Sequence, residues 1–233
     1  MSQTAIVAGV GPGLGAAVAR RFVEEGCQVG LFARSSEYIE NLADDLGENA
    51  LPVQVDITDE AAVVDGFDAV REAYGPVDIL VNNASGAAWD GLLDIDPPAF
   101  EQALAVSATG ALLCAQEAVA DMLEGDGGTV IFSGATSSIR GRGGAVGFSA
   151  AKFAARGLAE AMARELGPEG VHVAHVVIDG QILGPYDPED FDDRDEETFL
   201  DPDAIADAYW DLVTQDRSAW TLELDLRPHV EEF

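Results

Sequence analysis

Four glycines alternate with other residues near the start of the chain, where an expected strand gives way to a helix. Residues 9–15 read GVGPGLG. Glycines at such a turn let backbone N–H groups approach a pyrophosphate, and the positive end of the following helix attracts the same charge. No Gly-Lys-Ser/Thr follows, which disfavours a P-loop for nucleoside triphosphates. The turn is predicted to bind a dinucleotide through Gly9, Gly11, Gly13, Leu14 and Gly15.

The next candidate residues stand where the second and third expected strands end. A cofactor with a free 2′-hydroxyl usually needs a carboxylate acceptor after the second strand, but this chain has Arg34 and Ser35 there. The guanidinium can pair with a 2′-phosphate, and the serine hydroxyl can donate to it. The pattern favours NADP(H) over NAD(H). Asp56, after the third strand, suits the adenine amino group as an acceptor, or alternatively caps the next helix.

The elements that position these residues alternate along the whole chain. Short β-branched runs are separated by longer amphipathic runs, as at Ser36 to Leu46 and Pro98 to Leu123. The short runs include Thr4 to Ala8, Gln28 to Ala33, Val77 to Val81, which is the fourth expected strand, Val171 to Ile178, and Trp220 to Asp225, which is the last. Uninterrupted apolar strands joined by helices indicate parallel strands connected by right-handed crossovers. We expect one α/β domain over residues 1–233, a Rossmann-type doubly wound sheet of about seven strands with helices on both faces.

Composition limits the class of protein. Hydrophobic residues make up 48% of the chain, which suits a single large core. Two cysteines, Cys27 and Cys114, fit a reducing cytosol, and residues 1–9 lack the features of a signal peptide. No apolar run of about eighteen residues appears, so a soluble cytoplasmic protein is expected. The chain shows no metal-ligand spacing, and its acidic segment over 184–200 is expected to be a solvated loop or lid.

The charge balance is strongly acidic. Lys and Arg number 12, Asp and Glu number 43, and the formal net charge is −31; Lys152 is the only lysine. Such a charge repels nucleic acids and anionic membranes, so neither is an expected partner. The near-absence of lysine favours adaptation to a saline cytosol, where a short Debye length screens self-repulsion. The alternative is an ordinary acidic protein.

A family resemblance enters with the residues after the fourth expected strand, where 82–85 read NNAS. Together with the glycine turn, this segment resembles the short-chain dehydrogenase/reductase family, from Thr4 to about Asp225. The family's TGxxxGxG pattern is met except that Ala8 replaces the threonine, and its strand-end Pro-Gly becomes Asp179-Gly180. The resemblance implies a nicotinamide dinucleotide across the carboxyl ends of the sheet and a homo-oligomer, dimer or tetramer. It also implies cofactor contacts at Ile57, Asn83, Ala84, Gly180 and Ile182.

The family's catalytic residues are mostly replaced. Members of the family use a tyrosine as proton donor, a serine, a lysine that holds the ribose, and an asparagine on the preceding long helix. Residues 148–152 read FSAAK, so Phe148 stands in the tyrosine's place and Lys152 in the lysine's. Ala135 occupies the serine's usual position, and Ser133, Thr136, Ser137 and Ser138 lie close enough to supply a hydroxyl instead. Ser137 is taken as the candidate, and Ser107 takes the place of the asparagine.

These observations leave three functions open. The first is an NADP(H)-dependent oxidoreductase with an altered site, acting on the carbonyl or alcohol group of a small molecule. The second is a cofactor-binding protein without turnover, either a sensor or a partner subunit. Phe148 has no proton to donate, and a positioned general acid raises the rate about 10²–10⁴-fold. The third is a non-redox use of the fold. Arg140 and Arg142 flank the expected pocket and either attract an acidic substrate or are ordinary surface arginines.

Overall fold

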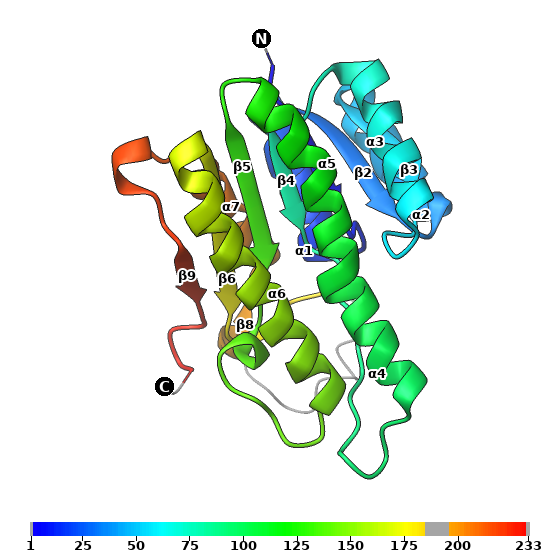
Figure 1. Ribbon diagram of the computed structural model, residues 1–233, viewed down its shortest axis with the longest axis vertical. Helices are drawn as coiled ribbons and strands as arrows, with labels where there is room; N and C mark the ends of the chain where they lie inside the picture. Colours follow the sequence, from blue (N-terminus) through cyan, green and yellow to red (C-terminus); the bar gives the residue numbers. More distant parts are fainter. Residues whose placement is uncertain (1, 185–195, 232–233) are drawn as a thin grey trace.

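The computed structural model describes residues 2–184 and 196–231. Within these residues, parallel strands form one seven-stranded sheet with the order β3-β2-β1-β4-β5-β6-β9 (Figure 1). The chain builds outward from β1 to β3, returns to the other side of β1, and continues to β9, so the predicted doubly wound sheet is confirmed. The strands are β1 (Thr4–Ala8), β2 (Gln28–Ala33), β3 (Ala50–Gln54), β4 (Ile79–Asn82), β5 (Gly128–Ser133), β6 (Val171–Ile178), β7 (Gln181–Ile182), β8 (Phe199–Leu200) and β9 (Glu223–Leu226).

Helices cover both faces of the sheet, because successive side chains of a strand point to opposite sides. On one face Ala5 and Val7 belong to a core formed with α1, α2 and α7, and on the other Ile6 and Ala8 belong to a core formed with α3, α5 and α6. Every residue of β1 is buried, as parallel strands with two covered faces require. The helices are α1 (Leu14–Glu24), α2 (Ser36–Leu46), α3 (Glu60–Tyr74), α4 (Pro97–Leu104), α5 (Ala111–Glu124), α6 (Val146–Leu166) and α7 (Pro202–Val213).

The largest departure from the predicted elements is the long helix expected over Pro98–Leu123. The structure has α4, then a π-helical turn over Ala105–Gly110, then α5. At this turn the helix approaches the loop after β3 so closely that a Cβ on Gly110 would meet the side chain of Ile57 at 2.7 Å. Such turns are rare and depend on local packing rather than on hydrophobic periodicity, which is why the apolar pattern does not reveal this one.

The same stretch, Pro97–Glu124, is long and apolar enough to cross a membrane by length and composition alone. Part of it is buried inside this fold, and α5 packs against the sheet. A core helix passes the same test, so the stretch is weak evidence for a membrane span.

Two strands begin later than predicted. The fourth was expected from Val77 but starts at Ile79, because the carboxylate of Asp121 on α5 accepts the Val77 N–H at 3.0 Å. The last was expected from Trp220 but starts at Glu223, since the Trp220 ring stacks on His172 with 5.0 Å between centroids. In both cases a side-chain contact holds the chain before it enters the sheet.

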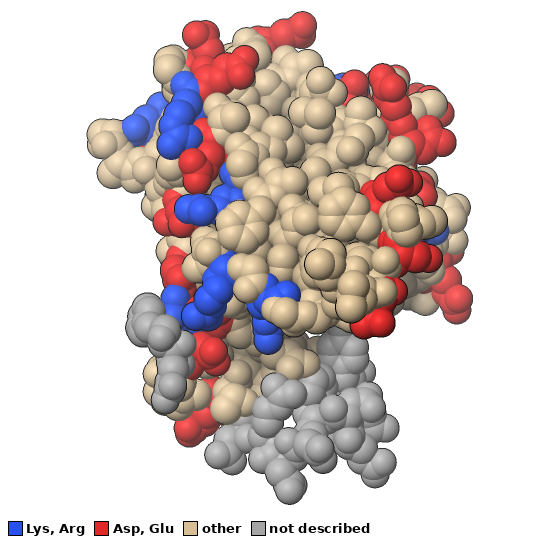
Figure 2. Space-filling model, turned by 60° about the horizontal axis from the view of Figure 1, so that its bottom comes forward, with Lys and Arg blue, Asp and Glu red and all other residues tan. Residues whose placement is uncertain are grey.

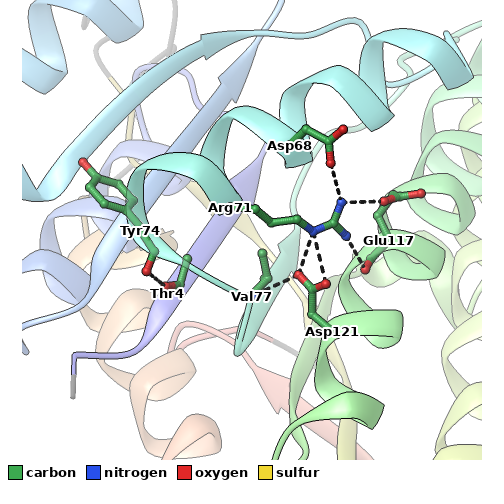
Figure 3. Close-up of polar contacts among 7 residues, drawn as sticks. All are labelled: Thr4, Asp68, Arg71, Tyr74, Val77, Glu117 and Asp121. Carbon is green, nitrogen blue, oxygen red and sulfur yellow. Dashed lines mark hydrogen bonds and ion pairs between the residues drawn. The ribbon is translucent and has the colours of Figure 1, made fainter.

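Arg71 ties α3 to α5 at the edge of the sheet opposite the strands' carboxyl ends (Figure 3). Its guanidinium contacts Asp121 at 3.0 Å, Glu117 at 2.9 Å and, on its own helix, Asp68 at 3.0 Å. These hydrogen bonds raise the pKa of Arg71 despite its partial burial. Asp121 also holds the chain that leads into β4, so one arginine fixes two helices and a strand entrance.

The acidic segment expected as a loop or lid lies mostly outside the described residues. Of residues 184–200, the structure describes 184 and 196–200. There a single 3₁₀ turn, Glu196–Thr198, leads into β8, which pairs with β7.

Candidate active site

The turn between β1 and α1 has the tight backbone that its glycines predict. Gly9 and Gly13 have φ values of +104° and +120°, which residues with side chains rarely adopt. A Cβ on Gly9 would lie 2.4 Å from the backbone nitrogen of Ala84, and one on Gly15 would lie 2.5 Å from the Gly9 carbonyl oxygen. At Gly11 a Cβ would meet nothing within 4 Å. The turn is therefore packed on its inner side and open on its outer side, as a cradle for phosphates requires.

This turn forms one wall of a cavity of about 1180 Å³. The cavity lies at the carboxyl ends of β1, β4, β5 and β6, which is the lower end of the sheet in Figure 1. The order of the strands reverses at β1, and open α/β sheets bind ligands at such a point. The predicted site residues that line the cavity are Gly9, Gly11, Gly13, Leu14, Gly15, Asn83, Phe148, Lys152, Gly180 and Ile182.

A chain of hydrogen bonds joins the glycine turn to α7. Asn83 donates to the carbonyl of Gly9 at 2.8 Å and accepts from the hydroxyl of Ser133 at 2.9 Å. Because Ser133 has used its proton, the phenol of Tyr209 donates to it, at 2.8 Å. Tyr209 is fully buried on α7, and its burial raises the pKa of the phenol. The chain fixes the ends of β4 and β5 against the turn.

Lys152 brings a buried ammonium group to the cavity. Its Nζ donates to the backbone carbonyl of Ser133 at 2.8 Å, and the residue is 5% exposed. Burial lowers the pKa of Lys152 to about 8, because water no longer solvates the charged form. The ammonium also lies 5.6 Å from the centroid of the Phe148 ring, one helical turn earlier on α6. Lys152, which was predicted as a site residue, therefore lines the cavity that the glycine turn also lines.

Phe148 presents a ring and no hydroxyl to the cavity. It stacks on Trp89 with 4.3 Å between centroids and an interplanar angle of 29°. Trp89 is 57% exposed and lines the cavity with it. The pair forms an apolar wall opposite the glycine turn's phosphate cradle.

The two predicted serines lie off the described cavity wall. Ser137 is 1% exposed in a 3₁₀ turn, and its hydroxyl has no hydrogen-bond partner among the described residues. Ser107 is buried in the π-helical turn, where its hydroxyl accepts the N–H of Gly86 at 3.0 Å. Thr136, one residue before Ser137, lines the cavity instead. Of the hydroxyl residues that the sequence offers here, the structure thus places Thr136 and Ser133 at the cavity wall, and not Ser137.

The residues expected around the adenosine lie at the ends of β2 and β3, outside the cavity wall described above. Arg34 and Ser35 are exposed at the end of β2, and Ile57 is buried beside the π-helical turn. Asp56 accepts both the backbone N–H and the hydroxyl of Thr58, at 3.0 and 2.8 Å. These bonds, and to a smaller degree Arg34, lower the pKa of Asp56.

Asp56 does not cap the next helix. The N-terminal cap of α3 is Asp59, whose carboxylate accepts the N–H groups of Ala61 and Ala62. The alternative interpretation of Asp56 as a cap is therefore wrong, and Asp56 closes a turn instead.

Asp179, on the cavity wall, was not predicted as a site residue. Asp179, at the end of β6, is buried, and its carboxylate accepts the hydroxyl of Thr136 at 2.5 Å. The signal for Asp179 is visible in the sequence, since it replaces the proline of the expected Pro-Gly pair.

Among the described residues, no group of three or more His, Cys, Asp or Glu could hold a metal ion.

Comparison with known proteins decides the family. The sequence pattern of the family described as short chain dehydrogenase matches residues 3–183, well over half of the chain. The protein belongs to the short chain dehydrogenase family. This short chain dehydrogenase is 28% identical to an uncharacterized oxidoreductase of Staphylococcus aureus (strain N315) over 230 residues, which are 97% of each chain.

Solved structures agree with this assignment. The short chain dehydrogenase is similar to a short-chain dehydrogenase from Rhodopseudomonas palustris, with a TM-score of 0.84, 29% identity and coverage of 97% and 99% of the two chains. It is also similar to a 3-ketoacyl-(acyl-carrier-protein) reductase from Brucella melitensis complexed with NADH, with a TM-score of 0.88, 26% identity and 97% coverage of each chain. The chain is thus an oxidoreductase of the short-chain type by family.

Proposed function

We propose that this protein binds NADP(H) and catalyses oxidation and reduction between an alcohol and a carbonyl group of a small molecule, through an altered catalytic site. One observation carries the proposal: the open glycine turn and the buried Lys152 ammonium face the same cavity. When bound, a nicotinamide nucleotide supplies reversible two-electron transfer at the reacting carbon. The chain's part is to hold the pyrophosphate at the turn, to hold the ribose through Lys152, and to shield the reacting group behind Phe148 and Trp89.

The choice of NADP(H) over NAD(H) rests on Arg34 and Ser35. Both side chains are exposed at the end of β2, where a 2′-hydroxyl would need a carboxylate acceptor. Asp56 lies near Arg34, but its carboxylate is already engaged by Thr58. An exposed guanidinium beside a serine hydroxyl matches a 2′-phosphate.

A titration of the purified protein in concentrated potassium chloride tests this choice. Calorimetry with NADPH, NADP⁺ and NADH is expected to show tighter binding of the phosphorylated pair. Arg34→Ala is expected to weaken NADPH binding about tenfold and to leave NADH binding unchanged, because a charge-assisted pair is worth about 1.5–3 kcal/mol. Arg20→Ala, on the exposed face of α1, is the matched control. If neither nucleotide binds, the proposed function fails.

A second candidate, a nucleotide-binding sensor without turnover, is favoured by Phe148, whose ring brings no proton to the cavity. Aldehydes, ketones and sugars tested with NADPH separate the two. If the NADPH-consuming activity stays with the protein through successive columns, the result supports the enzyme. Binding without consumption of any substrate, unchanged in Phe148→Tyr, supports the sensor.

We also propose that the protein forms a homodimer or homotetramer through its long helices. Leu112 and Leu123 on α5 and Phe153 on α6 are exposed by 38%, 47% and 44%. Figure 2 shows a broad area without charged side chains across one face of the molecule, bordered by acidic side chains on the right and by both basic and acidic side chains on the left. Light scattering of the protein in potassium chloride gives the mass directly.

The expected compartment is the cytoplasm. Cys27 and Cys114 are free and buried, and burial raises the pKa of Cys27 to about 11 and of Cys114 to about 12. Free, unreactive thiols fit a reducing environment. With its net charge of −31, we propose a small molecule as the partner, rather than a nucleic acid or a membrane.

A further inference from the structure

The cavity contains a hydroxyl–carboxylate pair to which the proposed function assigns no role. Thr136 donates through Oγ1 to Oδ1 of Asp179, and both residues line the cavity. The side chain of Asp179 is 4% exposed. Among the described lining residues there is no tyrosine, histidine or cysteine, and the only other carboxylate is that of Glu231, which is exposed near the end of the chain. Asp179 is therefore the buried carboxylate of this wall.

Two arginines lie beside this carboxylate. Nη1 of Arg227 lies 3.3 Å from one oxygen of Asp179, and Nη2 of Arg140 lies 3.9 Å from the other. A carboxylate only accepts hydrogen bonds, so Thr136 must donate its proton to Asp179. The Thr136 oxygen then has lone pairs left to accept a proton from a molecule in the cavity.

We infer that Thr136 and Asp179 are catalytic residues that together take up the hydroxyl proton of an alcohol substrate. The O–H proton moves to Oγ1 of Thr136 while the proton of Thr136 moves to Oδ1 of Asp179. The carbonyl bond forms as a hydride leaves the carbon for an oxidised nicotinamide nucleotide, and Asp179 afterwards returns the proton to water. The inference rests on the proposed function and assigns a proton acceptor to its alcohol oxidation.

The competing explanation is structural. Asp179 also links the end of β6 to Arg227 after β9 and to Arg140 in the loop before α6. Asp179→Asn would disturb these ion pairs, and its failure to fold would say little. Thr136→Val removes only the hydroxyl and leaves both arginine contacts, while Thr136→Ser restores the hydroxyl. Thr214→Val, at the exposed end of α7, is a matched control.

Binding of a probe alcohol gives a readout that needs no turnover. With the protein saturated by NADP⁺, we expect ¹⁹F NMR to show that 2,2,2-trifluoroethanol binds the wild type and Thr136→Ser. Thr136→Val and Asp179→Asn are expected to bind it about tenfold more weakly. The first variant removes the oxygen that accepts the alcohol O–H, and the second removes the carboxylate to which Thr136 donates.

Oxidation kinetics with propan-2-ol and cyclohexanol test the step itself. We expect kcat in Thr136→Val to fall about 10²-fold or more. In Thr136→Ser and Thr214→Val kcat is expected to stay within a few fold of the wild-type value, and the NADP⁺ affinity of all three variants is expected to be unchanged. Equal trifluoroethanol affinity in wild type and Thr136→Val overturns the inference, and so does a lower Tm with unchanged kcat. Failure to bind NADP⁺ at all refutes the proposed function instead.

Discussion

At the scale of single residues, burying the ammonium of Lys152 in the cavity costs free energy, and its lowered pKa shows this cost. A buried ammonium is less stable than a solvated one, and Lys152 donates to a neutral carbonyl, that of Ser133, rather than to a carboxylate. The pKa of Lys152 falls from 10.5 to about 8. The unfolded chain therefore holds this proton more tightly than the folded protein does. This cost is consistent with the ligand-binding role that we propose for Lys152.

This shift predicts a specific pH dependence for Lys152→Met. Between pH values of about 8 and 10.5 the unfolded state binds more protons at residue 152, so the wild type gains stability as pH rises through this window. We expect the unfolding free energy of the wild type, relative to the variant, to increase by about 3 kcal/mol from pH 7 to pH 10.5. Guanidinium titrations of both proteins at each pH measure it. Parallel pH curves for the two proteins would contradict a buried ammonium.

The sequence predicts site residues whose role follows from backbone conformation or charge. It predicts less well the site residues whose role depends on the exact register of a turn. The glycines and Lys152 were predicted and line the cavity. Ser137 was expected there, but the 3₁₀ turn after β5 points Thr136 into the cavity instead. One residue along such a turn rotates the side chain by about a third of a circle, and sequence spacing does not resolve that. The Thr136–Asp179 pair depends on the same rotation.

At the scale of elements, hydrophobic patterning predicts what lies in the sheet better than what interrupts a helix. The bounds of β1, β2, β6 and α2 agree with the prediction. Each of the three strands is a run of buried or partly buried residues, and α2 buries one face through Ile39, Leu42 and Ala43. The π-helical turn was not predicted. It depends on the contact of Gly110 with Ile57 and on the bond of Ser107 to Gly86, both between segments far apart in the chain.

The α3–α5 clamp of Figure 3 gives a prediction at this scale. Arg71→Gln leaves the carboxylates of Asp68, Glu117 and Asp121 facing one another without their shared cation. We expect the unfolding free energy to fall by about 2 kcal/mol or more, because a partly buried network loses its central charge. Urea unfolding at moderate potassium chloride measures this loss.

Arg164→Gln is the control for that experiment, since Arg164 is exposed and is paired with Glu160 one turn away on α6. An exposed helical pair contributes about 0.3–0.5 kcal/mol. The loss in Arg71→Gln is also expected to shrink as salt rises, because the three carboxylates then repel each other less. Equal losses in the two variants would show that the clamp contributes no more than a surface pair.

At the scale of the whole molecule, a net charge of −31 acts on every other interaction. Helix α2 illustrates it: residues 36–46 hold four acidic side chains and no basic one. Glu40 and Asp44 are exposed and four residues apart, so they face each other along the helix and destabilise it. At an ionic strength of 1 M the Debye length is about 3 Å, against about 10 Å at 0.1 M. Salt thus removes most of this repulsion.

We therefore expect Tm to rise by about 10 °C or more between 0.1 and 1 M potassium chloride, equivalent to a few kcal/mol for a chain of this size. The double variant Glu40→Gln/Asp44→Asn separates screening from general salting-out. It removes two repelling charges of α2, so it is expected to raise Tm at low salt and to change it little at high salt, which flattens the salt response. Calorimetric scans of both proteins across the salt series measure the two slopes. A rise of equal slope in the wild type and the variant would point to exclusion of salt from the surface, and a flat wild-type response would refute salt adaptation.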